Sequence, residues 1–302
     1  MSVILDRLAP GARVAVVRLR SLGDCVLTTP ALHLLKTARP DLEVAVIVED
    51  AFGPVFEGNP DVDRIMPPST TELAHWRPEL VLNLHGGNRS TQLTFASRAK
   101  LRAGFAHFRF RAVYNVRIPR AQDILKVDRK VHTAEHLASA MFFLGVPRRE
   151  IPRARLFETV STNRPARPYA VIHAIASAPE KTWPAERFLE VAKHLKRDAG
   201  LEPVFIAGPG EDLHAFQRYR CITGAPLSEI KSLLAHASMF VGNDSGPAHM
   251  AAAFGVRSVV LFGPSDHEVW APWKTDAVVL NSNEIAGITV EQVTAALTGM
   301  PV

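Results

Sequence analysis

The chain has 302 residues, of which 47% are hydrophobic and 22% are charged, and its formal net charge is +5. This length suits two domains, and this composition is ordinary for a globular protein. The low aromatic content of 7% disfavours base-stacking platforms for single strands. The modest positive charge favours an anionic small molecule or a membrane surface over duplex DNA. We therefore expect no nucleic-acid partner.

The cysteines and the N-terminus indicate the compartment. Cys25 and Cys221 lie far apart and lack the spacing of a zinc site, which is typical of a reducing environment. Asp6 and Arg7 interrupt the first apolar residues, so a signal peptide is not expected. No apolar run reaches the ~18 residues of a membrane span. We expect a cytoplasmic protein.

Apolar runs alternate with helical patterns along the first half of the chain. This alternation predicts a parallel α/β sheet with right-handed crossovers. The expected strands cover 13–17, 42–48 and 80–84, and their continuous apolar character is typical of strands buried on both faces. The expected helices begin at Asp24 and near Ser90, and a third covers 132–144.

The segment 147–168 is rich in proline and arginine, lacks periodicity and is the best linker candidate. A fresh cycle follows it, with strands expected at 169–172, 203–207, 239–241 and 258–262 and helices at 185–196, 227–237, 248–253 and 289–297. We therefore expect two doubly wound α/β domains, 1–160 and 161–302. Such sheets bind ligands at the carboxyl ends of their strands, so two that face each other define a cleft.

The first strand is followed by Arg18-Leu-Arg-Ser-Leu-Gly-Asp24, which lacks the G-x-G-x-x-G pattern of a dinucleotide site. Gly23 would permit a sharp turn there, and Asp24 would begin the helix. The carboxylate of Asp24 is either a helix N-cap or a general base that takes a proton from an attacking hydroxyl.

The stretch 242–255 is predicted to be a strand end that turns at once into a helix. Its first turn carries three residue types that cap helices, and these are Asn243, Asp244 and Ser245. Gly246 lets a ligand approach the backbone N–H groups, which with the helix dipole make an anion site. An ordinary capped turn fits the stretch equally well. His249 lies one helical turn further on, on the same face.

Two more loops follow strands of the second half. Lys181 lies between Pro179 and Pro184, which restrict the backbone on both sides, so it is either a phosphate clamp or a solvated lysine. Glu211 lies in a glycine-rich turn and could hold ribose hydroxyls, although a plain loop fits as well.

The segment from Leu80 to Gln122 contains no acidic residue. Its basic residues are Arg89, Arg98, Lys100, Arg102, Arg109, Arg111, Arg117 and Arg120. Four aromatic residues are interleaved with them, namely Phe105, Phe108, Phe110 and Tyr114. A solvated charged face is the usual explanation of such a run. The one-sided charge also favours an anionic partner surface, phosphorylated or lipid-borne, so peripheral contact with the inner membrane is a hypothesis.

Several catalytic motifs are absent from the sequence. The chain has no Walker A loop, G-x-S-x-G elbow or H-E-x-x-H zinc helix. Metal dependence therefore has no support in the sequence, and we expect neither a metal nor a cofactor.

Four stretches, taken in order, resemble the heptosyltransferases of glycosyltransferase family 9. They are Ser21-Leu-Gly-Asp24 with Thr28-Thr-Pro-Ala-Leu32, Lys181-Thr-Trp-Pro184, Gly242-Asn-Asp-Ser-Gly-Pro-Ala-His249 and Leu261-Phe-Gly-Pro-Ser-Asp266. The resemblance implies a GT-B fold, in which two facing Rossmann-like domains bind the acceptor and the nucleotide-sugar. It also implies inverting, metal-independent transfer of heptose from ADP-heptose to a lipopolysaccharide core, a lipid-linked anionic saccharide.

The resemblance implies roles for single residues as well. Asp24 matches the catalytic base, and Arg18, Ser21 and Gly23 accompany it on the acceptor or phosphate side. The implied donor contacts are Ser177 and Lys181 for the phosphates, Glu211 for the ribose, Asp244 for the sugar, and Ser245 and Gly246 for the diphosphate, with His249 in support. The segment Ala174-Ile-Ala176 replaces the Pro-Gly-Ala of many relatives, which leaves the exact donor open.

Three alternatives remain open at this point. The first is a transferase of the same fold that uses another nucleotide-sugar, and the second is a non-catalytic sugar-nucleotide-binding protein. A nicotinamide dehydrogenase ranks last, because its glycine fingerprint is missing after the first strand.

Overall fold

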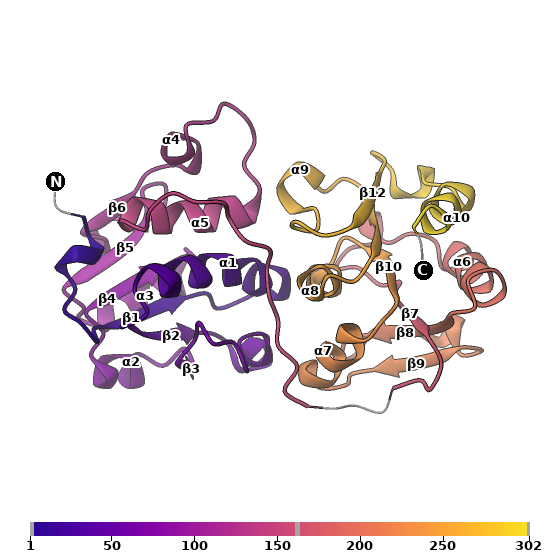
Figure 1. The fold of residues 1–302 in the computed structure, drawn as a ribbon, viewed down its shortest axis with the longest axis horizontal. Coiled ribbons are helices and arrows are strands. Elements are labelled where there is room, and N and C mark those ends of the chain that lie inside the picture. Colours follow the sequence, from indigo (N-terminus) through magenta and orange to yellow (C-terminus); the bar gives the residue numbers. More distant parts are fainter. Residues whose placement is uncertain (1–2, 161–163, 301–302) are drawn as a thin grey trace. The chain divides into compact units, whose positions relative to one another are not determined.

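The computed structural model describes residues 3–160 and 164–300, and the chain divides between Phe157 and Glu158 into two compact units. The unit that ends at Phe157 is called unit 1, and the unit that begins at Glu158 is called unit 2. Figure 1 shows the sheet and the helices of each unit.

Unit 1 contains a six-stranded sheet in which all neighbouring strands are parallel. The strands are β1 (Arg13–Val17), β2 (Glu43–Ile47), β3 (Arg64–Met66), β4 (Leu80–Asn83), β5 (Leu101–Phe105) and β6 (Val116–Ile118). Their spatial order is β3-β2-β1-β4-β5-β6. The direction of strand addition therefore reverses between β1 and β4, which is the switch point where doubly wound sheets bind ligands.

The helices of unit 1 follow the strands of its sheet. They are α1 (Leu22–Ala38), α2 (Thr70–Trp76), α3 (Asn88–Ala96), α4 (Ala121–Leu125) and α5 (Thr133–Leu144), with short 3-10 turns η1 (Leu5–Arg7), η2 (Asp50–Val55) and η3 (Arg111–Val113). α1 packs against α5. The last four residues of β1 are fully buried, as a parallel strand covered on both faces requires.

Unit 2 repeats this topology with a second parallel six-stranded sheet. The strands are β7 (Tyr169–His173), β8 (Glu202–Ala207), β9 (Arg220–Thr223), β10 (Met239–Asn243), β11 (Ser258–Phe262) and β12 (Ala277–Asn281). Their spatial order is β12-β11-β10-β7-β8-β9. The switch point therefore lies between β7 and β10, where Gly242 pairs with His173.

The helices of unit 2 again alternate with the strands. They are α6 (Ala185–Arg197), α7 (Leu227–Ala235), α8 (Gly246–Phe254), α9 (His267–Trp270) and α10 (Val290–Thr298), with 3-10 turns η4 (Pro179–Lys181), η5 (His214–Phe216) and η6 (Ile285–Gly287). Trp183, Phe188 and Phe205 are among the largest fully buried side chains of this unit. The predicted α/β class is confirmed, and each strand and helix predicted from the sequence is present near its expected range.

The basic segment Leu80–Gln122 differs from the expectation. It contributes β5 and β6 to the sheet of unit 1. Phe105 and Tyr114 are only 1% and 2% exposed, so these two of the interleaved aromatic residues cannot belong to a partner surface. Their rings lie in the core of unit 1, whereas Phe110 stays 39% exposed.

The first part of the predicted linker belongs to unit 1. The backbone N–H of Arg155 donates to Thr29 Oγ1 at 3.0 Å, and Ile151 and Leu156 are buried. The predicted linker is therefore partly packed, with the Arg155 backbone bound to α1 of unit 1. Residues 161–163 of that prediction lie outside the described residues.

Candidate active site

The carboxylate of Asp24 contacts two side chains rather than the helix backbone. Asp24 lies in the first turn of α1, whose N-cap residue is Ser21. The Ser21 hydroxyl donates to Asp24 Oδ2 at 3.2 Å, and Arg18 Nη1 lies 3.3 Å from Asp24 Oδ1. Gly23, expected to make a sharp turn, is instead a helical residue of α1. Asp24 is therefore not the N-cap, and its side chain stays 21% exposed.

Arg18 is a buried cation beside that carboxylate. It directly follows β1, and only 7% of its side-chain surface is exposed. Burial lowers the pKa of the Arg18 guanidinium, and the charge of Asp24 opposes that shift. Because a buried charge is costly without a partner, the ion pair fixes the guanidinium and thereby orients the carboxylate.

Two histidines near Arg18 are held neutral. His85 follows β4, and burial lowers its pKa, with the charge of Arg18 lowering it further. His136 of α5 stacks on Phe105, with ring centroids 4.0 Å apart. Burial lowers the pKa of His136 to about 4, and His107 and Arg18 add to the effect. The carboxylate and the guanidinium are thus accompanied by imidazoles that carry no charge at neutral pH.

Asn83, the last residue of β4, shapes the loop that leads into α3. Its Oδ1 accepts from the backbone N–H groups of His85 and Gly86, both at 3.0 Å. Its Nδ2 donates to the hydroxyls of Thr94 and Tyr114. Since Gly86 has a φ of 73°, the turn needs a residue that tolerates the left-handed region. The loop at the switch point of unit 1 is therefore rigidly built.

Asn243 plays the equivalent part in unit 2, at the end of β10. Its Nδ2 donates to the carbonyl of Ala174 at 2.9 Å, and its Oδ1 accepts from the N–H of Trp183 at 3.1 Å. The prediction that Asn243 caps α8 was wrong, because the fully buried side chain ties down the β7–α6 loop (residues 174–184) instead. The anchor uses the carbonyl of Ala174, so the Ala174-Ile-Ala176 segment leaves it in place.

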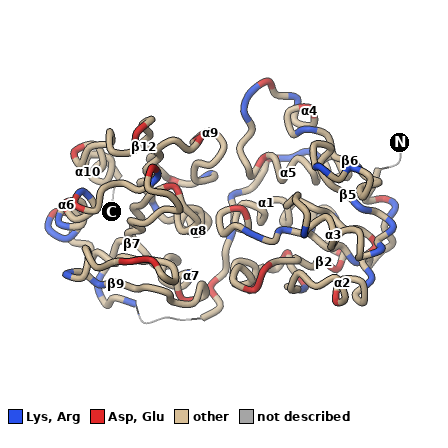
Figure 2. Tube along the Cα trace, turned by 180° about the vertical axis from the view of Figure 1, so that it is seen from behind, with Lys and Arg blue, Asp and Glu red and all other residues tan. Residues whose placement is uncertain are grey.

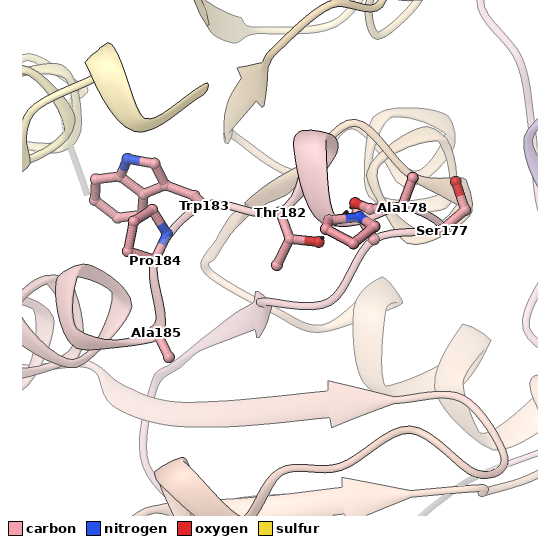
Figure 3. Close-up of a pocket in the computed structure, with 8 residues that line it drawn as sticks. Ser177, Ala178, Thr182, Trp183, Pro184 and Ala185 are labelled. Carbon is pink, nitrogen blue, oxygen red and sulfur yellow. Dashed lines mark hydrogen bonds between the residues drawn. The ribbon is translucent and has the colours of Figure 1, made fainter. Parts of the chain in front are cut away.

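The β7–α6 loop lines a shallow pocket of about 470 Å³. Figure 3 shows Ser177 at one end of this loop and the ring of Trp183 at the other. Thr182 Oγ1 donates to the carbonyl of Ala178 at 3.0 Å and so braces the loop. Ser177 therefore lies on an open, mostly apolar surface.

Lys181 and Asp244 lie close enough to interact electrostatically. Lys181 ends η4, and Asp244 directly follows β10. Burial raises the pKa of the Asp244 carboxyl, while the nearby Ser265 hydroxyl and the charge of Lys181 oppose that rise. The loops after β7 and β10 thus bring the ammonium group of Lys181 near the carboxylate of Asp244.

α8 begins at Gly246 without a side-chain cap. Ser245 is its N-cap residue, but the Ser245 hydroxyl makes no capping bond. The first N–H groups of a helix lack intrahelical acceptors and carry the positive end of the helix dipole. His249 is only 5% exposed, so the surrounding structure covers its ring. The backbone N–H of Gly246 therefore lies where anions bind at a helix N-terminus.

His173, the last residue of β7, joins two of the predicted residues and was itself not predicted. Its Nδ1 lies 3.0 Å from Ser245 Oγ, and its Nε2 lies 4.0 Å from Glu211 Oε2. Glu211 Oε2 also accepts from the N–H of Gly208 at 2.6 Å. Burial lowers the pKa of His173 to about 4, and Glu211 opposes that shift. The sequence did contain one signal for His173, because a titratable residue here ends an otherwise apolar strand.

The structure therefore gathers the predicted residues into separate groups. Unit 1 brings together Arg18, Ser21 and Asp24. Unit 2 brings Ser245 and Glu211 to His173, and Asp244 to Lys181. Within residues 3–160 and 164–300, no three His, Cys, Asp or Glu side chains are placed to hold a metal ion. No helix in those ranges is long and apolar enough to cross a bilayer.

Two doubly wound units with one shared strand order, each with polar side chains at its switch point, define a GT-B type fold. A sequence model of glycosyltransferase family 9 (heptosyltransferase) matches residues 72–297. The chain therefore belongs to glycosyltransferase family 9 and is an enzyme of the glycosyltransferase class.

The chain is similar to known proteins over most of its length and of theirs. Lipopolysaccharide heptosyltransferase 3 of Escherichia coli is 23% identical over 85% of this chain and 85% of its own. The structure of a family 9 glycosyltransferase from Veillonella parvula matches with a TM-score of 0.84 at 24% identity, covering 97% of this chain and 98% of that one. The structure of the E. coli ADP-heptose lps heptosyltransferase II matches with a TM-score of 0.79 at 20% identity, covering 95% and 98%.

Proposed function

We propose that this glycosyltransferase moves a heptose from ADP-heptose to a lipopolysaccharide core acceptor, with inversion and without a metal ion. The names of the relatives support the donor and the acceptor, since they include an ADP-heptose lps heptosyltransferase and a lipopolysaccharide heptosyltransferase. The observation that carries the proposal is the uncapped N-terminus of α8, with Lys181 in the neighbouring loop. These groups suit a diphosphate that leaves with its electron pair.

The reaction is a single displacement at the anomeric carbon. Asp24 takes the proton of the acceptor hydroxyl, whose oxygen forms the new bond to that carbon as the bond to the diphosphate breaks. Arg18 and Ser21 hold the two carboxylate oxygens and so aim the base. The charge that grows on the leaving diphosphate is stabilised by Lys181 and by the N–H of Gly246.

The remaining donor residues have assigned roles in this proposal. Glu211 binds the ribose hydroxyls, Asp244 contacts the heptose, and Ser177 contributes to the phosphate side from the β7–α6 loop. Unit 1 then binds the acceptor, and unit 2 binds the donor. A base in one unit and a leaving-group site in the other require both units for turnover.

Nucleotide binding and transfer together test this proposal. In a thermal-shift panel of ADP, UDP and GDP, ADP should raise the melting temperature most. With ADP-heptose and core saccharides that lack heptose, mass spectrometry should detect one added heptose for each ADP released. Preference for UDP or GDP would indicate another nucleotide-sugar. Binding of ADP-heptose without transfer to any core acceptor would favour a non-catalytic binding protein.

Peripheral contact with the cytoplasmic face of the inner membrane is part of the proposal. Figure 2 shows Lys and Arg along β5, β6 and the adjoining segments. Phe95 is 69% exposed and Phe110 39%, and the Arg109 guanidinium lies 5.5 Å from the Phe110 ring centre. Cations with exposed aromatic rings suit an anionic bilayer surface. Cosedimentation with phosphatidylglycerol vesicles should be strong and should fall with salt, whereas salt-insensitive exclusion from them would contradict the contact.

A further inference from the structure

His173 occupies the central position of the sheet in unit 2. β7 lies between β10 and β8 in the sheet, so its last residue has a neighbouring strand end on each side. Ser245 follows β10, and Glu211 follows β8. One imidazole at this position can therefore contact the residues that follow both neighbouring strands.

The approach of the backbone at this point depends on Gly242. A Cβ atom built on Gly242 would lie 2.8 Å from the His173 carbonyl oxygen and 3.2 Å from the His173 Cβ. The 2.8 Å contact with a backbone oxygen would force the strands to shift, so β10 reaches β7 this closely only with glycine. The close approach brings Ser245 Oγ to within 3.0 Å of His173 Nδ1.

The charge beside His173 favours one tautomer of its ring. We assign the proton to Nε2, because that nitrogen faces the Glu211 carboxylate at 4.0 Å, a distance at which the attraction is electrostatic and not a hydrogen bond. His173 Nδ1 then carries a lone pair and accepts from the Ser245 hydroxyl. Because that hydroxyl has one proton, it is directed at the imidazole and not at a ligand. Burial also keeps the ring neutral, since it lowers the pKa of His173 to about 4.

We propose that His173 is a positioning residue that links ribose recognition by Glu211 to diphosphate recognition at the start of α8. It holds the Ser245 hydroxyl and thereby the β10–α8 turn, so that the backbone N–H of Gly246 rather than the Ser245 side chain meets the diphosphate. The ligand class is a nucleoside diphosphate. The inference rests on the proposed function, because that function places a nucleotide at this switch point.

Calorimetric titration of the full chain with ADP tests the link. His173→Phe keeps a ring and removes both nitrogens, and it should weaken ADP binding about tenfold, the worth of one oriented hydrogen bond. His173→Asn restores an acceptor near the Nδ1 position and should return the affinity to within about threefold of wild type. A packing role alone predicts that Asn is worse than Phe at this buried site, and that ranking would overturn the inference.

A double-mutant cycle with Ser245→Ala sharpens the result. His173→Phe should cost at least as much as Ser245→Ala, because it also removes the attraction to Glu211, and the double variant should cost no more than His173→Phe alone. Losses that multiply would contradict the link. Wild-type protein that binds no nucleoside diphosphate contradicts the proposed function itself, whereas wild-type binding with an unaffected His173→Phe variant contradicts only this inference.

The tautomer can be measured without any nucleotide. ¹⁵N NMR of the imidazole at pH 7 should show His173 protonated on Nε2 alone, with a shift of the Nδ1 resonance in Ser245→Ala. A ring protonated on Nδ1, or a charged ring, would overturn the inference independently of the binding data.

Discussion

The two units share one strand order and differ in the charge that they place at their switch points. After β1, unit 1 buries the Arg18 guanidinium against the carboxylate of Asp24. At the end of β7, unit 2 buries the neutral imidazole of His173 beside an uncapped helix. An oriented carboxylate suits a base that takes up a proton, and a neutral link beside the N–H of Gly246 suits a departing anion. The fold thus fixes where each site lies, and the residues after the strands fix its chemistry.

The asparagines that end β4 and β10 differ in the loop that they fix. Asn83 binds the backbone of its own loop, at His85 and Gly86. Asn243 binds Ala174 and Trp183, which lie in the loop of the neighbouring strand. Asn83 therefore fixes the loop that follows its own strand and also reaches Thr94 and Tyr114, whereas Asn243 fixes the loop that follows the neighbouring strand.

The largest effect is expected at the base. Asp24→Asn should lower the rate of transfer by about 10³-fold or more, because the amide cannot take the proton. The affinity for ADP should stay unchanged, since Asp24 lies in unit 1. Asp123→Asn, in the exposed first turn of α4, is the matched control and should transfer like wild type. Turnover by Asp24→Asn at the wild-type rate would rule out its role.

The leaving-group side should show the next largest effect. Lys181→Met should lower kcat/KM by between about 10²- and 10³-fold, because it removes one charge-stabilising donor. In contrast to Asp24→Asn, it should also weaken ADP binding in calorimetry. The exposed Lys193 of α6 provides the control, Lys193→Met, with no loss expected. An unchanged ADP affinity in Lys181→Met would remove Lys181 from the donor site.

A smaller effect is expected from the buried guanidinium. Arg18→Met should lower kcat by about 10- to 100-fold, because the Asp24 carboxylate loses the partner that orients it. ADP affinity should not change, which separates this variant from those in unit 2. Arg7→Met removes an exposed arginine of the same unit and should leave kcat unchanged. A kcat loss in Arg18→Met that matches a loss of folded protein would assign Arg18 to stability alone.

The buried histidines should make both units sensitive to acid. The pKa values of His136 and His173 are lowered to about 4, so the unfolded chain binds more protons than the folded chain between pH 6.5 and 4. Stability is therefore fully present above pH 6.5 and is lost as the pH falls, by about 2 kcal/mol per histidine between pH 7 and 5.

Urea unfolding at several pH values measures this loss. His136→Gln should flatten the acid slope of unit 1 and leave that of unit 2, whereas the exposed His75→Gln control should change neither. A His136→Gln variant with the full wild-type slope would show that His136 is not the group responsible.

Sequence reasoning found the interior strands except β5, and it missed the edge strands β3, β6, β9 and β12. β1 and β10 are continuous apolar runs with strong signals. β3, β6 and β9 are short, and β9 has no buried residue, so their sequences carry little hydrophobic pattern. Their pairing is decided by the neighbouring strand, which a local pattern cannot reveal.

Some residues of the candidate site were also predicted from the sequence, and others were missed. Asp24 and the start of α8 were predictable, because helix starts after apolar strands have a recognisable composition. His173 was missed, since its partners Ser245 and Glu211 come from distant segments that meet only through the strand order. Asn243 was assigned to a cap because its side chain reaches a loop that no local rule connects to it.

The central claim is that unit 2 holds the donor diphosphate at its switch point. A crystal structure with intact ADP-heptose tests it most directly. We predict that the diphosphate lies within hydrogen-bond distance of Lys181 Nζ and Gly246 N, with the ribose hydroxyls at Glu211 and the Ser245 hydroxyl still directed at His173. A nucleotide bound away from the ends of β7 and β10 would contradict the account.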